Sequence, residues 1–298
     1  MHNNGLLINA LMANIATSAD DYQFWRDEKL ANAATSIDAC LVEVNNPSQL
    51  SVAEKDKIVT LCRYNNFALF HVPQQQNYES ALVDFNQQFS LKAFDQHLYV
   101  KNQGLAHITQ TNQKDQAEFI PYTDRAIGWH TDGYYNSVEN RIRAFSLFCV
   151  NPAKQGGENQ WIDQQMVYLL LREENPAIIE ALSHPQAMSI PEHVVDNVVR
   201  RKTSTGPIFF IDDMTNQLSM RYTQRKKNID FHDSIEIKQA VECLDQLLAD
   251  NTQYHFSHTM KTGQGLICNN VLHKRSSFIN DQDEPRLMLR GRYFNSIR

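Results

Sequence analysis

The sequence predicts an α+β protein in which helices flank and interrupt a β-sandwich or barrel. Strand-like segments dominate the middle and the end of the chain, whereas helical periods lie early, in about residues 1–100, and in an insert at about 164–260. A regular β-α-β alternation is missing, and no repeat or Gly/Pro-rich linker divides the chain. We therefore expect a single domain over residues 1–298, with its β-rich core at about 101–298.

Helices are expected where apolar residues recur at helical spacing behind a capping residue. Ser51 and Glu54 open the segment SVAEKDKIVTLCRYNN with the spacing of a capping box, and Ile58 and Cys62 continue it on one face. Further helical periods cover residues 79–91, 163–182 with a break at Pro176, and 233–251.

Strands are expected where short apolar or alternating runs end at turn residues. The nine-residue run at 142–150 ends at Asn-Pro, and the Gly156-Gly157 pair after it marks a tight connection. The remaining strand candidates are 41–46, 67–72, 206–212, 218–223 and two β-rich segments at 263–278 and 285–297.

Composition limits the function classes. The formal net charge of −6 argues against a nucleic-acid partner, which normally meets a basic surface stripe. The five cysteines are scattered without a C-x-x-C pair, as in a reduced cytoplasmic protein without a structural zinc site. The short apolar run near the N-terminus follows no Lys or Arg, and no run reaches membrane-spanning length. We expect a cytoplasmic protein with no membrane partner.

The segment GWHTDGYYN carries the first sign of chemistry, because His130 and Asp132 stand two residues apart. In an extended strand both side chains point to the same face. His273 lies in a predicted strand 143 residues later (273 − 130). Two imidazoles and one carboxylate form a facial triad for a divalent iron, with three positions left open. The alternative is chance, since an H-x-D pair is often a surface or turn feature and a lone histidine is often a satisfied core residue.

The C-terminal segment PRLMLRGRYF carries the second sign. By the period of two, Arg286, Arg290 and Arg292 share one face of a predicted strand with Met288. Either this is an edge strand with a charged outer face, or the guanidinium groups line a site that holds carboxylates.

Taken in order, FALFHVPQQ, FNQQFS, WHTDGYY, GGENQWID, NNVLHKRSSF and PRLMLRGRYF resemble the iron(II)- and 2-oxoglutarate-dependent oxygenases of the taurine dioxygenase-like superfamily. The motif pattern is most similar to the branch containing gamma-butyrobetaine hydroxylase, without its small zinc-binding module. The resemblance spans most of the chain and implies a double-stranded β-helix, or jelly-roll, core. It also implies Fe(II) as the metal and 2-oxoglutarate and O2 as co-substrates.

The same resemblance implies roles for individual residues. His130, Asp132 and His273 would bind iron, and Arg286, thirteen residues past His273, would pair with the far carboxylate of 2-oxoglutarate. Asn159 stands where many relatives have Thr or Ser, so its amide either donates to that carboxylate or caps the turn.

Substrate contacts are expected around the same centre. Arg290 lies where superfamily members grip an anionic substrate group. Tyr134 and Tyr135 either cover the pocket or pack in the core, and tyrosine rings would also suit a quaternary ammonium. The basic run that includes Arg221, Arg225, Lys226 and Lys227 is either a solvated loop or a further contact with an anion.

The expected reaction is hydroxylation of an unactivated C–H bond in a small molecule bearing a carboxylate, sulfonate or betaine group, with release of succinate and CO2. A carboxylate at position 132 leaves no place for chloride on the metal, which argues against a halogenase. Three alternatives stay open: desaturation or cyclisation with the same cofactors, a catalytically silent jelly-roll binding or sensor protein, and a cupin-like zinc or manganese enzyme. The substrate, the stereochemistry and a homo-oligomeric state also stay open.

Overall fold

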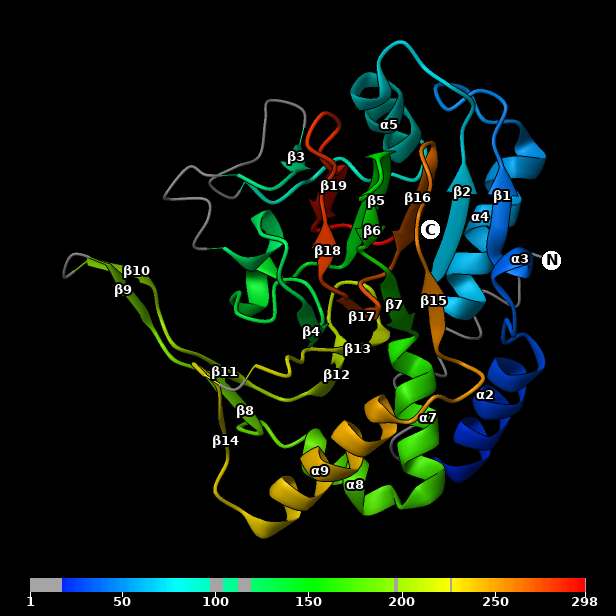
Figure 1. Ribbon diagram of the computed structural model, residues 1–298. Helices are drawn as coiled ribbons and strands as arrows, with labels where there is room; N and C mark the ends of the chain where they lie inside the picture. Colours follow the sequence, from blue (N-terminus) through cyan, green and yellow to red (C-terminus); the bar gives the residue numbers. More distant parts are fainter. Residues whose placement is uncertain (1–17, 97–103, 112–118, 196–197, 226, 298) are drawn as a thin grey trace.

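A computed structural model describes residues 18–96, 104–111, 119–195, 198–225 and 227–297, and its largest element is a six-stranded sheet (Figure 1). Of its neighbouring pairs, β1 and β2 run parallel and the others antiparallel. The strand order is β1 (Leu41–Glu43), β2 (Phe67–His71), β16 (Gln264–Cys268), β5 (Ala144–Asn151), β19 (Leu287–Tyr293) and β3 (Leu105–Ile108).

A four-stranded sheet packs against one face of the large sheet. The ring of Phe67 on β2 lies 5.5 Å from that of Trp161 and 4.9 Å from that of Phe256, both in the smaller sheet, and Trp161 is fully buried. Phe145 on β5 similarly meets His273. The smaller sheet has the order β15 (Phe256–His258), β7 (Asn159–Ile162), β17 (Leu272–Arg275) and β4 (Ile127–His130).

Helices cover the outer face of the large sheet. Phe70 on β2 stacks on Phe85 of α5 with ring centroids 4.2 Å apart, and Ile58 and Cys62 of α4 belong to the same buried cluster. The expected capping box is present at Ser51, the N-cap of α4. The N-terminal helices are α2 (Ala19–Ala31), α3 (Ile37–Cys40), α4 (Val52–Asn65) and α5 (Tyr78–Gln87).

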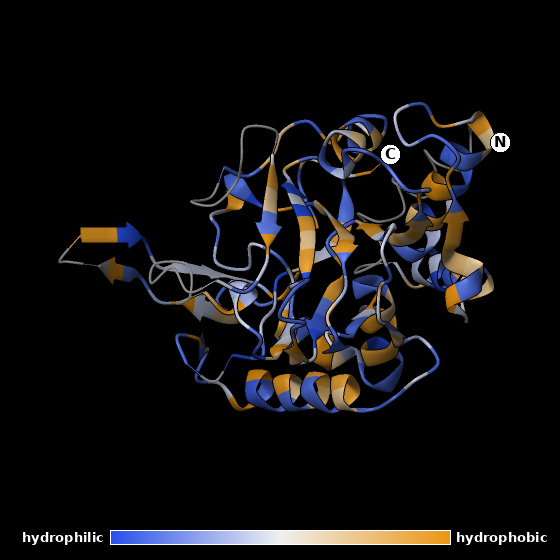
Figure 2. Cartoon of the chain, turned by 45° about the horizontal axis from the view of Figure 1, so that its top comes forward, coloured by the Kyte–Doolittle hydropathy of each residue, from blue (hydrophilic) through white to orange (hydrophobic). Residues whose placement is uncertain are grey.

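Three further helices pack beside the smaller sheet, in a second core with Trp129 and Leu272 (Figure 1). Asn175 ends the first helix and caps the next, in agreement with the break expected at Pro176. In Figure 2 hydrophobic residues concentrate in the central strands and recur along the helices, as expected for elements with one buried face. The three helices are α7 (Gln164–Glu174), α8 (Pro176–Leu182) and α9 (Ile235–Ala249).

Short hairpins and bridges occupy the region between α8 and α9. The β9–β10 hairpin projects from the body of the protein (Figure 1). Its strands are β9 (His193–Val195) and β10 (Val198–Arg201). A small sheet beside it has β8 (Met188–Ile190) in the middle, paired with β11 (Ser204–Gly206) on one side and β14 (Asp230–Phe231) on the other. The remaining elements are β12 (Phe209–Asp212), β13 (Gln217–Met220), β6 (Gln155–Gly156), β18 (Phe278–Ile279), η1 (Ile120–Tyr122) and η2 (Val138–Asn140).

These elements confirm the mixed helix and sheet composition that the sequence predicts. All five cysteines are free thiols. None of the helices in the described ranges combines the length and the apolar character needed to cross a bilayer. The apolar run at the N-terminus lies outside the described residues.

Candidate metal centre

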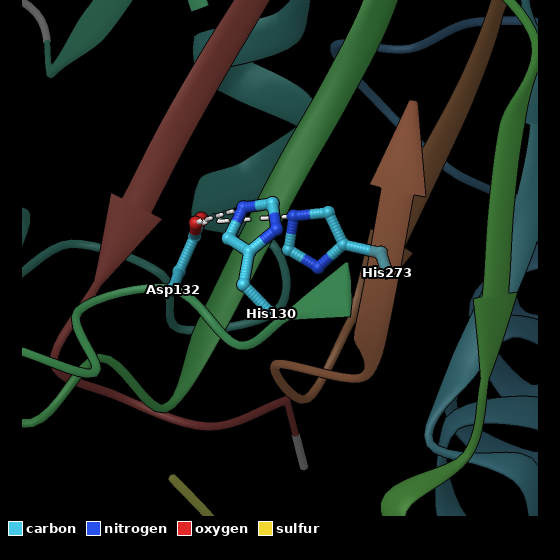
Figure 3. Close-up of side chains that lie close together, drawn as sticks. All are labelled: His130, Asp132 and His273. Atoms are coloured by element: carbon cyan, nitrogen blue, oxygen red, sulfur yellow. Dashed lines mark ion pairs between the residues drawn. The ribbon is translucent and has the colours of Figure 1, made fainter. Parts of the chain in front are cut away.

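The two histidines and the aspartate singled out in the sequence meet at one point in the smaller sheet (Figure 3). His130 is the last residue of β4, and the antiparallel register places it directly opposite His273 of β17, with ring centroids 4.2 Å apart. The Nε2 atoms of both rings lie 3.9 Å from Oδ1 of Asp132. One potential ligand atom from each residue therefore lies within 4.8 Å of the other two.

Asp132 reaches this point by a different route from the one predicted. β4 ends at His130, so Asp132 lies in a turn and not on the same strand face. Asn270 fixes the turn: its Oδ1 accepts from the backbone N–H of Asp132 at 2.8 Å, and its Nδ2 donates to the Asp132 carbonyl at 3.0 Å. Nδ2 also donates to the carbonyl of Ile142 at 2.7 Å, so one amide ties the turn to the start of β5.

The protonation of the site suits metal binding. Nδ1 of His130 donates to the Gly128 carbonyl and Nδ1 of His273 to the Val271 carbonyl, each at 2.9 Å, which leaves both Nε2 lone pairs facing Asp132. Burial, and for His130 also the neighbouring ring, lowers the pKa of His130 to about 3 and the pKa of His273 below its usual range. Burial alone would raise the pKa of Asp132, but Arg290 and His273 outweigh it and hold that pKa below its usual range.

A divalent cation fits this donor set. Oδ2 of Asp132 is buried and has no hydrogen-bond partner in the described part of the chain, a state that costs free energy unless a ligand satisfies it. Two neutral imidazoles and one carboxylate match the facial arrangement of non-heme iron. Arg290 forms an ion pair with Oδ1 of Asp132 and thereby balances the carboxylate charge in this structure.

The arginine side chains of β19, and that of Arg286 just before it, line the interior and do not face solvent. β19 lies between β5 and β3, so it is not an edge strand, and Arg286 and Arg292 are buried. The edge-strand interpretation of the C-terminal segment is therefore wrong. Arg292 pairs with Asp95 and donates to the hydroxyl of Tyr135 at 2.9 Å.

Arg286 is held without a counter-charge. It is 3% exposed, its guanidinium packs on the Phe278 ring at 5.0 Å, and no carboxylate pairs with it among the described residues. Burial lowers its pKa to about 10, so it remains a cation at neutral pH. Gly157 lies close by: a Cβ there would stand 3.4 Å from Nε of Arg286. An uncompensated buried guanidinium is a ready site for a carboxylate ligand.

Arg275 is a buried cation that our sequence interpretation missed. It follows His273 by two residues on β17, and therefore shares its face. Burial and then Arg286 lower its pKa to about 9, and its guanidinium donates to the carbonyls of Thr123 at 2.9 Å and of Pro121 at 3.3 Å. The H-x-R spacing was the available signal. Arg275 holds the 121–125 loop against the site.

Asn159 begins β7 opposite Arg275 in the register, and it is buried. Its Nδ2 donates to the carbonyl of Gly157 at 3.4 Å, which is the turn-capping contact considered from the sequence. The Gly157 turn links it to Arg286, so both expected 2-oxoglutarate residues border the same segment.

The expected substrate residues divide into two groups. Tyr134 is 6% exposed, and its ring stands edge-on to that of His130 with centroids 6.5 Å apart; Tyr135 packs against it at 5.0 Å. Arg221 is buried, and its Nε, Nη1 and Nη2 donate to backbone carbonyls, among them those of Tyr134 at 2.6 Å and Met188 at 2.9 Å. Its donors are therefore occupied by the main chain. Lys226 lies outside the described residues.

A cavity of about 490 Å³ borders the other side of the Asp132 turn. Asp132 and Tyr134 line it, but neither histidine, nor Arg286, nor Arg290 does. We place the candidate reactive centre at the convergent ligand atoms and the uncompensated guanidinium, and not in this larger cavity. Reacting molecules have to contact the groups that perform the chemistry.

The fold and the centre thus define a class, proteins with a two-histidine, one-carboxylate metal site between two packed sheets. Residues 26–292 match the taurine catabolism dioxygenase TauD, TfdA family, and the chain belongs to this family.

Individual relatives agree with that membership. A uridine-5'-phosphate dioxygenase from Streptomyces sp is 26% identical over an alignment of 195 residues that covers 63% of this chain and 68% of that protein. An asparagine oxygenase, solved with Fe(II), 3-hydroxyasparagine and succinate, shares the fold with a TM-score of 0.61 at 12% identity, over 98% of this chain and 92% of its own. A putative alpha-ketoglutarate-dependent taurine dioxygenase from Burkholderia xenovorans shares the fold with a TM-score of 0.56 at 15% identity, over 85% of this chain and 88% of its own.

Family membership confirms the predicted enzyme class. The protein is an oxidoreductase of the iron- and 2-oxoglutarate-dependent dioxygenase type, with Fe(II), 2-oxoglutarate and O2 as its requirements.

Proposed function

We propose that the protein hydroxylates an unactivated C–H bond of a small charged molecule. One observation carries the proposal: the protein interior contains both a complete His130–Asp132–His273 ligand set and a buried cation, Arg286, without a counter-charge. A ligand set alone would also fit a metal-binding sensor. The guanidinium adds a place for the second carboxylate of a chelating 2-oxo acid.

Each residue has a defined task in this reaction. His130, Asp132 and His273 would hold Fe(II), which with 2-oxoglutarate supplies O2 activation and the release of succinate and CO2. The Gly128 and Val271 carbonyls keep both imidazoles in the tautomer that presents Nε2.

The other polar residues orient the two organic molecules. Arg286 would hold the far carboxylate of 2-oxoglutarate, with the Asn159 amide as a second donor. The ring of Phe145 lies 4.6 Å from that of His273 and 5.9 Å from the Arg290 guanidinium, and it keeps water from that side of the centre. Arg290, freed from Asp132 when a metal takes the carboxylate, would face an anionic substrate group.

The finer assignments belong to the same proposal. The two packed sheets would form a jelly-roll core within one domain over residues 1–298, in the branch that contains gamma-butyrobetaine hydroxylase. We also propose a cytoplasmic enzyme with small-molecule partners and no nucleic-acid or membrane partner. The similarity to an asparagine oxygenase and to a uridine-5'-phosphate dioxygenase supports a small polar substrate.

The first experiment tests the cofactor site. Under anaerobic conditions, Fe(II) and 2-oxoglutarate together should produce the weak visible charge-transfer band of an iron chelate, and admission of air should release succinate. Hydroxylation adds 16 mass units to the substrate and desaturation removes 2, so product mass distinguishes the two reactions. If the band does not form and no succinate is released, the silent binding or sensor protein is favoured. If protein purified without chelators contains zinc or manganese, a cupin-like enzyme is favoured.

The second experiment tests Arg286. Arg286→Gln should raise the apparent KM for 2-oxoglutarate by roughly tenfold to a hundredfold, since a hydrogen bond to a charged group contributes about 1.5–3 kcal/mol. Affinity for the metal alone should not change, because Arg286 touches none of the three ligands in this structure. An unchanged KM would contradict the assignment.

A further inference from the structure

Two tyrosine rings separate the metal ligands from a pair of arginines. Tyr134 stands edge-on to His130, and Tyr135 stands edge-on to Tyr134, so the rings form a short wall that leads away from the centre. The guanidinium of Arg225 lies 5.8 Å from the Tyr134 ring, and that of Arg201 lies 5.5 Å from the Tyr135 ring. A cation therefore already lies against each ring.

This arrangement decides between two substrate chemistries. A quaternary ammonium binds to open aromatic faces and avoids other cations. Here a guanidinium accompanies each ring, so a cationic group would meet like charge. An anion would find donors in the same place.

Neither arginine has a carboxylate partner among the residues that the structure describes. Nη2 of Arg201 donates to the Pro191 carbonyl at 2.9 Å, while its Nη1 is buried without a hydrogen-bond partner. Burial lowers the pKa of Arg201, and the nearby charge of Arg225 lowers it further. The two cations thus add uncompensated positive charge to one region.

The neighbouring arginines differ in this respect. Arg292 pairs with Asp95 and with the Tyr135 hydroxyl, and Arg290 pairs with Asp132. Arg221 is bound to main-chain carbonyls. Arg201 and Arg225 are left as the pair with free charge next to the tyrosine wall.

We propose that Arg201 and Arg225 form an anion subsite that holds a phosphate-monoester group of the substrate. The proposal rests on the function proposed above and names the substrate class for that site. A dianion matches the two uncompensated charges, whereas a monocarboxylate would leave one unmatched. Its three terminal oxygens can also accept from two guanidinium forks at once. The wall of Tyr134 and Tyr135 places the remainder of the molecule toward His130.

Direct binding measurements test the subsite without turnover. Titration calorimetry on the full chain, at constant ionic strength and without added metal, would use phenyl phosphate, benzoate and phenyltrimethylammonium as probes. We expect phenyl phosphate to bind at least about tenfold more tightly than benzoate, and the ammonium probe to show no measurable binding. Equal affinity for phenyl phosphate and benzoate, or preference for the ammonium, would overturn the proposal.

Variants locate the binding. Arg201→Gln and Arg225→Gln should each weaken phenyl phosphate binding by about tenfold or more, as expected for loss of a charge-assisted contact. Arg200→Gln is the matched control, because Arg200 is an exposed neighbour on β10. Arg225 is itself exposed, so its replacement should leave folding intact, and unfolding curves for each variant would check this. Equal weakening in Arg200→Gln, or weakening only in Arg286→Gln, would refute the subsite.

The charge-transfer band separates the two proposals. A protein that forms the band with Fe(II) and 2-oxoglutarate but shows no preference for phenyl phosphate would retain its proposed function and lose the subsite. A protein that binds phenyl phosphate through Arg201 and Arg225 but never forms the band would retain the subsite and lose the proposed function.

Discussion

Replacement of Asn270 by alanine should weaken metal binding although Asn270 is not a ligand. Its side chain makes three hydrogen bonds, two of them to the backbone of Asp132. These bonds hold the turn that follows β4 and contains Asp132. Without them Asp132 retains its carboxylate but loses the anchor that places it 3.9 Å from both Nε2 atoms.

The size of the effect follows from those contacts. Three hydrogen bonds at about 1 kcal/mol each, in a site where Asn270 is 9% exposed, give a loss of about 3 kcal/mol in the free energy of unfolding. Asn270 also has a φ of +51°, a left-handed conformation that costs alanine about 1 kcal/mol more. For metal affinity, loss of a residue that orients a ligand typically costs about 10- to 100-fold.

Calorimetric titration of the metal-free protein with Fe(II) or Mn(II) measures the affinity, and urea denaturation measures stability. Asn270→Gly removes the amide without the left-handed strain, so it should lose metal affinity to the same extent as alanine and lose less stability. Asn228→Ala is the control for strain alone, since Asn228 is exposed with a φ of +59°. A folded Asn270→Ala protein with wild-type metal affinity would show that Asp132 is placed by something else.

Three further changes test the surrounding fold by urea denaturation. Glu54→Gln should lower the free energy of unfolding by about 1 kcal/mol at pH 7. Hydrogen bonds from Ser51 lower the pKa of Glu54, so this stability is present above the ordinary carboxyl pKa of about 4.3 and is lost as the pH falls below that value and through the lowered pKa. Gly156→Ala should lower the free energy of unfolding by about 2–3 kcal/mol, because φ is +75° and a Cβ would lie 2.4 Å from a backbone carbonyl oxygen. A variant as stable as the wild type would contradict the turn conformation described for Gly156. Lys29→Met should lower the free energy of unfolding by about 3–5 kcal/mol, because it leaves the buried Asp163 without its cation. Lys238→Met removes the cation of an exposed pair with Asp233 and should lower it by less than about 1 kcal/mol.

Much of the fold could be predicted because local signals and tertiary packing agree. The Ser51 capping box and the break at Pro176 follow from backbone hydrogen bonding alone, and both appear as expected. The candidate ligand cluster could be predicted because His130 and Asp132 stand two residues apart in sequence and His273 stands in an apolar strand. The strand face assumed for Asp132 was wrong: the long-range contact with Asn270, 138 residues away, bends the chain there.

Long-range register explains why the burial of Arg275 and the position of Arg201 could not be predicted from sequence. Arg275 is buried only because β17 lies between β4 and β7, and a charged residue at that position in an edge strand would face solvent. Arg201 sits at the base of a hairpin whose sequence shows exposed valines and arginines without a motif. Its contact with the Tyr135 ring depends on where the base of that hairpin packs, which no local sequence pattern determines.

In the proposed function, reaction type and substrate choice depend on different parts of the protein. In the proposed reaction, iron and 2-oxoglutarate would require three ligand atoms and a cation for a far carboxylate. His130, Asp132, His273 and Arg286, the residues proposed for these roles, lie on or next to strands of the two packed sheets. The proposed anion subsite, in contrast, consists of Arg201 at the end of β10 and Arg225 in the loop after β13, and neither arginine belongs to the buried core clusters. Substitution at these two positions would therefore alter recognition while the chemistry of the centre stays the same. Exchange of Arg201 or Arg225 is accordingly the change that should alter substrate preference without altering the iron chelate.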